Sequence, residues 1–204
     1  MVVLSEPVCQ ALAETSITRY TNDSEELDDL VAVAMAVRDF SVGNNAAAMP
    51  TGEDYRTAIT PDAIKHLLDV RVVFLGTGVA TVLVFIALAV LVFLCVKRHG
   101  VQRLARPLVV GGGAPLAATG ILAIAIAVDF SAFFTWMHSL FFASGTWTFP
   151  ADSLLIRALP YEFWVSCAIV WAASMVLLCV ISVVIGLVLA RRLRSRSLSG
   201  SPSH

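Results

Sequence analysis

Residues 72–96 read VVFLGTGVATVLVFIALAVLVFLCV, a stretch of 25 residues without a charged side chain. At about 1.5 Å per residue, a helix of this length can cross a hydrocarbon core of roughly 30 Å. Residues 107–128 and 165–190 are two further stretches that satisfy the same criterion. Hydrophobic residues make up 58% of the chain and charged residues 14%, and the mean hydropathy of +0.82 excludes an ordinary soluble domain. The sequence therefore predicts an all-α membrane protein with three transmembrane helices.

The distribution of charge predicts how these helices are oriented. Twelve of the fifteen acidic residues precede Arg71, whereas eight of the fourteen basic residues form two short clusters beside the predicted spans. Lys and Arg close to span ends stay in the cytoplasm, so both residues 1–71 and residues 129–164 are expected on the outer side. The clusters are Lys97, Arg98, Arg103 and Arg106, and Arg191, Arg192, Arg194 and Arg196.

This orientation divides the chain into seven predicted regions. They are an extracytoplasmic helical region (1–59), a helix that enters and forms the first span (60–96), a cytoplasmic loop (97–106), the second span (107–128), an extracytoplasmic aromatic segment (129–164), the third span (165–190) and a basic cytoplasmic tail (191–204). Exporting the acidic first region requires a signal that this sequence does not contain. We therefore expect a fourth span before Met1, missing from this chain, with unaided export of the tail as the alternative.

The outer region is expected to contain about two helices, and a third helix leads from it into the first span. Leu27, Leu30, Val31 and Met35 have helical spacing. Thr60 is a suitable N-cap, followed by Pro61 at the first helical position. On that helix Asp62, His66 and Asp69 share one face, which is either a small polar site at fixed depth or simply a solvated face.

Residues 129–164 hold eleven of the eighteen aromatic residues, which is typical of the membrane interface. Gly145, Pro150 and Pro160 interrupt the segment, so we expect a re-entrant interfacial segment instead of a spanning helix. His138 lies among the aromatic residues, where a packing role is more common than a catalytic one. Asp129 either terminates the second span or orients a histidine.

Several classes of function are disfavoured by the sequence. The predicted spans contain no charged side chain, which argues against an ion channel or secondary transporter. The four cysteines have no metal-ligand or disulfide spacing, and Gly111, Gly112 and Gly113 lack the Lys-Ser/Thr ending of a phosphate loop and indicate close helix packing or a kink. We expect no cofactor, no metal and no nucleic-acid partner.

Two motifs resemble one known family. They are ITPDAIKHLLDV (residues 59–70) and MHSLFFASGTWTFPADSLLIRALPYEFW (residues 137–164), which begins eight residues after Asp129. Together they are similar to the bacterial lipoprotein intramolecular transacylases, over roughly residues 15–185. The resemblance implies an enzyme of the bacterial cytoplasmic membrane, active at its outer face. It would act on diacylglyceryl lipoproteins, moving the sn-2 acyl chain to the α-amino group of the lipoprotein's own N-terminal cysteine and leaving a lyso-form lipoprotein.

The family's two catalytic histidines fall on His66 and His138. From the chemistry we expect His138, in its aromatic setting, to stay neutral and act as the general base. We expect His66, flanked by Asp62 and Asp69, to be easier to protonate and to serve the glycerol oxygen or the oxyanion, although the two roles are interchangeable. Asp69 and Asp129 are candidate orienting groups, and Arg157 is a candidate for stabilising the oxyanion. The acyl groove is expected to be lined by Phe133, Phe134, Phe141, Phe142 and Trp147.

Two other functions remain open from the residues alone. A zinc-dependent membrane hydrolase could use His66, Asp69 and His138 as ligands and leave one position for water. A non-catalytic membrane scaffold would also account for the aromatic segment and the outer region. The scaffold predicts that both histidines can be replaced without consequence.

Overall fold

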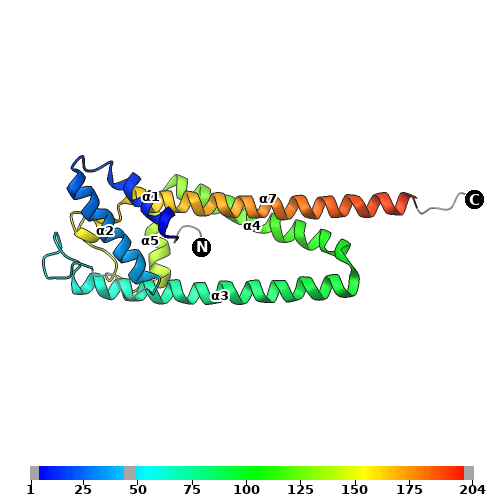
Figure 1. The fold of residues 1–204 in the computed structure, drawn as a ribbon, viewed down its shortest axis with the longest axis horizontal. Coiled ribbons are helices and arrows are strands. Elements are labelled where there is room, and N and C mark those ends of the chain that lie inside the picture. Colours follow the sequence, from blue (N-terminus) through cyan, green and yellow to red (C-terminus); the bar gives the residue numbers. More distant parts are fainter. Residues whose placement is uncertain (1–4, 44–48, 200–204) are drawn as a thin grey trace, which may run out of the picture. The chain divides into compact units, whose positions relative to one another are not determined.

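The structure, a computed structural model, describes residues 5–43 and 49–199, and describes side chains as far as Leu193. Met1 and the side chains of Arg194 and Arg196 therefore lie outside the described residues. Within the described ranges every regular element is a helix, so the predicted all-α class is confirmed (Figure 1). The helices are α1 (Glu6–Ile17), α2 (Ser24–Ser41), α3 (Pro61–His99), the short η2 (Val101–Leu104), α4 (Ala105–Val128), α5 (Phe130–Phe141), α6 (Leu154–Ala158) and α7 (Tyr161–Ser199).

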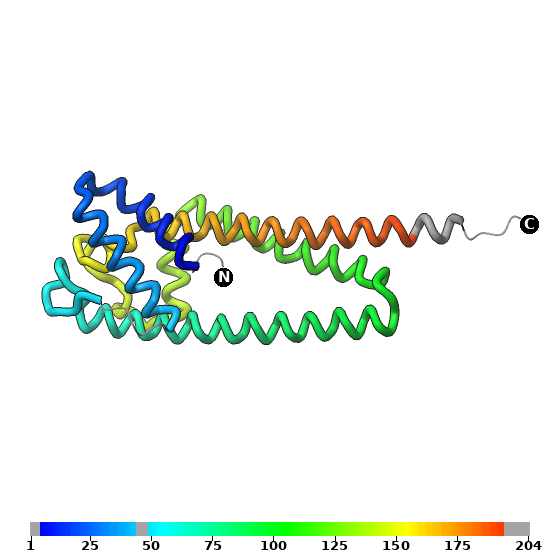
Figure 2. The backbone as a smooth tube through the Cα atoms, viewed as in Figure 1, coloured from blue at the N-terminus to red at the C-terminus, as the bar shows by residue number. Residues whose placement is uncertain are grey.

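Three helical segments are long and apolar enough to cross a membrane, as predicted. They are Pro61–His99, Val101–Val128 and Tyr161–Leu193. The first predicted span, residues 72–96, is part of α3, which runs as one continuous helix (Figure 2). Large apolar side chains such as Phe85 and Ile121 are 67% and 69% exposed. Apolar surface of this extent is suited to contact with lipid.

The described residues form two compact units, and the first lies within residues 1–79 and 129–171. Its core is a single apolar cluster to which α1, α2, α6 and the start of α3 all contribute. The predicted amphipathic helix is α2, which buries Leu30 and Val31 and packs Leu27 and Met35 against the same cluster. Burial of these apolar faces stabilises short helices that would be only marginally stable in isolation.

Polar side chains at the helix starts fix where the elements of this unit begin. The Thr60 hydroxyl accepts a hydrogen bond from the Ala63 amide at 3.4 Å, which confirms the predicted cap of α3. Asp129 accepts from the Ala132 amide at 2.9 Å and so caps α5. Both caps satisfy amide groups that a first helical turn leaves without partners. The aromatic segment, residues 129–164, consists of α5, a loop, α6 and the start of α7.

The second unit lies within residues 80–128 and 172–204 and contains closely packed helices. A Cβ added at Gly112 on α4 would lie 2.8 Å from the Cys179 carbonyl oxygen on α7. A Cβ at Gly186 on α7 would lie 2.8 Å from the Ala105 carbonyl oxygen. Small residues at such contacts allow helix backbones to approach closely. The prediction of close packing at the triple glycine is confirmed at Gly112, whereas Gly111 and Gly113 have nothing within 4 Å of an added Cβ.

Candidate active site

His66 and His138 come together within the first unit, although they are far apart in the sequence. His66 lies on the second turn of α3, six residues before the apolar stretch, and His138 lies in the last turn of α5. Their ring centroids are 6.1 Å apart and the ring planes differ by 30°. The two side chains are 7% and 9% exposed. A small reacting group could therefore contact both rings in a site largely shielded from water.

Aromatic rings surround this histidine pair. The Phe134 ring lies 3.8 Å from the His138 ring, one helical turn earlier on α5. The Phe142 ring lies 4.9 Å from His66 and 5.4 Å from His138, so it contacts both. Trp147 lies 4.9 Å from His138, and Phe149 lies 5.8 Å from His66. The aromatic residues around the histidines therefore come from both α5 and the loop that follows it.

A backbone contact fixes the tautomer of His138. Its Nδ1 lies 2.9 Å from the Phe134 carbonyl oxygen. A carbonyl only accepts hydrogen bonds, so Nδ1 carries the proton and the neutral ring has its lone pair on Nε2. His138 therefore offers a defined proton acceptor to a bound molecule.

Burial favours the neutral form of both rings. It lowers the pKa of His66 below its ordinary value, and the neighbouring His138 acts in the same direction while Asp69 opposes both. Burial also lowers the pKa of His138, and the Phe134 carbonyl opposes the change. The sequence suggested that Asp62 and Asp69 would favour a charged His66, but burial outweighs the nearby carboxylate. Two neutral imidazoles are well suited to accept and pass on a single proton.

Two buried side-chain nitrogen atoms in this site have no hydrogen-bond partner among the described residues. They are His66 Nδ1 and Trp147 Nε1. Buried polar groups are almost always paired, so each is a group that a bound molecule could satisfy.

The other predicted site residues occupy different places. Asp69 is exposed one turn after His66. Asp129 caps the opposite end of α5 from His138, about 13 Å along the helix axis. Arg157 forms an ion pair with Glu26, which connects α6 to α2. The structure therefore brings none of the three into hydrogen-bonding contact with the histidine rings.

Of the five predicted groove residues, three contact the histidine pair: Phe134, Phe142 and Trp147. Phe133 instead lies 5.9 Å from Trp136, and Phe141 is 54% exposed. Phe149 was not predicted, although its place in the aromatic segment could have indicated it. Among the described residues no three metal-ligating side chains form a group that could hold an ion, so His66, Asp69 and His138 are not assembled as the zinc alternative requires.

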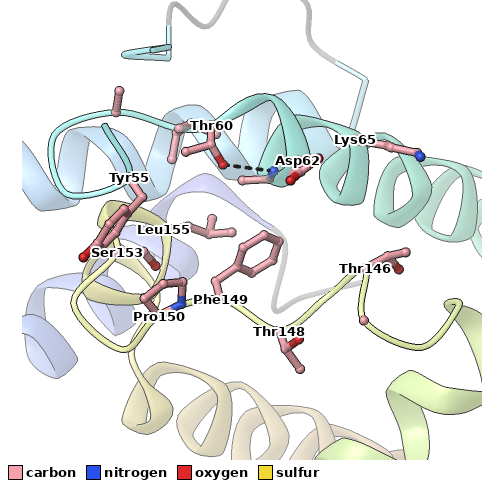
Figure 3. Close-up of a pocket in the computed structure, with 14 residues that line it drawn as sticks. Tyr55, Thr60, Asp62, Lys65, Thr146, Thr148, Phe149, Pro150, Ser153 and Leu155 are labelled. Carbon is pink, nitrogen blue, oxygen red and sulfur yellow. Dashed lines mark hydrogen bonds between the residues drawn. The ribbon is translucent and has the colours of Figure 1, made fainter. Parts of the chain in front are cut away.

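A pocket of about 370 Å³ lies beside the histidine site, and Phe149 belongs to both. One wall is the start of α3, with Thr60, Asp62 and Lys65. The facing wall is the loop after α5, which contributes Thr146 and Thr148 (Figure 3). The pocket is lined by both hydroxyl and charged groups, in contrast to the aromatic surroundings of the histidines.

Of three comparisons with known proteins, one found a match. A search of curated proteins and a search of solved structures each found no match. Residues 13–164, by contrast, match the family model described as lipoprotein intramolecular transacylase Lit. The match includes both histidines, the aromatic segment and the pocket. The chain therefore belongs to the lipoprotein intramolecular transacylase family, and its family name indicates a membrane acyltransferase that acts on lipoproteins.

Proposed function

We propose that this protein moves the sn-2 acyl chain of a diacylglyceryl lipoprotein to the α-amino group of the lipoprotein's own N-terminal cysteine. The observation that carries the proposal is the pair of buried histidines, with ring centroids 6.1 Å apart, inside the segment that matches the family. The product is a lyso-form lipoprotein. The reaction converts an ester into an amide, which is downhill, so the protein has to supply orientation and proton transfer only.

The histidines are suited to the proton transfers that this reaction requires. The α-amine has an ordinary pKa of roughly 7.7–8, so a modest base is sufficient. His138 Nε2 accepts the amine proton as nitrogen bonds to the ester carbonyl carbon. The bond from that carbon to the glycerol oxygen then breaks, and the same proton, held in turn by the histidine pair, reaches the glycerol oxygen. Both rings end neutral, as burial favours.

Holding donor and acceptor together accounts for much of the remaining catalysis. Both groups belong to one substrate molecule, and a well-oriented intramolecular reaction gains up to about 7–11 kcal/mol from proximity. The aromatic surroundings formed by Phe134, Phe142 and Trp147 would hold the glyceryl group and the start of the acyl chain. Excluding water from this site also protects the ester from hydrolysis.

We assign the adjacent pocket to the peptide that follows the modified cysteine. Thr60, Asp62 and Lys65 precede His66 on α3, so they lie on the side of the histidine away from the apolar stretch 72–96. A bound lipoprotein has the same order, with acyl chains in the membrane, the ester next and the peptide beyond. The basic clusters at the span ends support an orientation in which this side of the protein lies outside the cytoplasmic membrane.

The proposal is tested by mass spectrometry of a lipoprotein's N-terminal peptide. The chain is expressed, with and without an added upstream span, in bacteria that lack lipoprotein N-acylation. We expect an N-acyl, S-monoacylglyceryl cysteine, which is lost in both His66→Ala and His138→Ala. An unchanged diacylglyceryl peptide from well-expressed protein would refute the transacylase and favour the scaffold.

A further inference from the structure

The transacylation creates a negative charge on the ester carbonyl oxygen, and this charge requires a hydrogen-bond donor. When the amine nitrogen bonds to the ester carbonyl carbon, the electron pair of the C=O double bond moves onto oxygen. Enzymes of acyl transfer place hydrogen-bond donors where this oxyanion develops. The cation suggested by the sequence, Arg157, is engaged by Glu26 on α2. A donor to the oxyanion would therefore be one of the groups that surround the histidine pair.

Trp147 supplies a group with the required properties. Its indole Nε1 is buried and has no acceptor among the described residues. An indole N–H is a donor only, so it can be satisfied by an oxygen and never by another donor. The same ring lies 4.9 Å from the ring of His138. The Trp147 indole is thus a hydrogen-bond donor without an acceptor among the described residues, and it lies beside His138, the proposed base.

Three other potential donors in this unit already have hydrogen-bond partners. His138 Nδ1 is already engaged by the Phe134 carbonyl. The Ser139 hydroxyl donates to the Trp136 carbonyl at 2.7 Å. The Trp164 indole, which is also in this unit, donates to the Leu159 carbonyl at 3.1 Å. Trp164 shows how an indole is normally satisfied here, and Trp147 differs from it.

We propose that Trp147 is a catalytic residue whose indole N–H donates a hydrogen bond to the oxyanion of the tetrahedral intermediate. This inference rests on the proposed transacylase function. The hydrogen bond forms fully only when the carbonyl oxygen becomes charged. It is released when the C=O double bond re-forms and the glycerol oxygen leaves. Trp147 gains and loses no proton in the process.

Removing the N–H while keeping an aromatic ring tests the assignment. In Trp147→Phe we expect kcat to fall by about 10²–10³-fold, as for the loss of one oxyanion donor, with KM little changed. The matched control is Trp136→Phe, because Trp136 is 54% exposed and its ring contacts Phe133 instead of a histidine. That variant should retain the kcat of the unchanged protein.

A second variant separates the hydrogen bond from packing. Replacing Trp147 by 3-benzothienylalanine exchanges only the N–H for sulfur and keeps the size of the ring. Loss of kcat with unchanged KM and thermal stability would support the inference. Full kcat in this variant, or a change confined to KM or stability, would overturn it and leave Trp147 as a groove residue. A wild-type protein that makes no lyso-form product would instead refute the transacylase function itself.

Discussion

The clearest quantitative prediction concerns two neighbouring glycines of α4. In Gly112→Ala the new Cβ would lie 2.8 Å from the Cys179 carbonyl oxygen and 2.9 Å from Val183 Cγ2 on α7. Ordinary contacts begin at 3.4 Å, so the shortfall is 3.4 − 2.8 = 0.6 Å against a backbone atom. In Gly113→Ala nothing lies within 4 Å of the new Cβ. The two variants therefore add the same methyl group to one helix in opposite surroundings.

The expected energies follow from these surroundings. Alanine in place of an interior helical glycine stabilises a helix by about 0.5–1 kcal/mol, and Gly113→Ala should show this gain. Overpacking costs about 1–3 kcal/mol, so Gly112→Ala should be less stable than Gly113→Ala by that amount. Thermal unfolding of both proteins in the same mild detergent measures the difference. Equal unfolding temperatures would show that α4 and α7 do not approach as closely as described.

The remaining predictions concern the site. Ser139→Ala should retain most transacylation in the peptide assay, and loss of turnover would contradict direct transfer. Arg157→Met should lower stability by at most about 1 kcal/mol, because its ion pair is partly exposed, and should leave kcat unchanged; a fall in kcat would restore its oxyanion role. Thr148→Trp should raise KM for a whole lipoprotein but not for a lipidated cysteine alone, and equal effects would argue against the peptide assignment. Because burial lowers the pKa of His66 and His138, the unfolded chain binds more protons below about pH 6.5. Stability should therefore be full above that pH and fall as the pH is lowered, and unfolding temperatures that do not change between about pH 5 and 7.5 would contradict this account.

The sequence was most informative where the physics is local. Charge-free length was sufficient to find the three membrane helices, and the Thr60-Pro61 pair marked the start of α3. Helical spacing likewise identified the buried face of α2. Each of these features depends on residues within a few turns of one another, so a linear pattern contains the relevant information.

Contacts between distant segments were less accessible. No periodicity relates His66 to His138, and only the family resemblance paired them before the structure did. Arg157 looked available for an anion because Glu26 is far away in the sequence, although α2 and α6 pack together. The sequence also did not indicate which aromatic residues of the loop after α5 face the histidines. The direction of each loop side chain depends on backbone geometry that composition does not encode. Phe149, a residue of this loop, faces His66 for this reason.

The continuity of α3 also limits how this protein can vary. His66 and the apolar stretch 72–96 belong to one uninterrupted helix, so a residue inserted between them would turn the histidine by about 100° as well as moving it by about 1.5 Å. A flexible linker would absorb such a change, but a helix transmits it in full. Residues 67–71 therefore set the rotation and the axial position of His66 relative to the apolar stretch. The number of these residues matters more than most of their identities. Substitutions there should be tolerated far more often than single insertions or deletions.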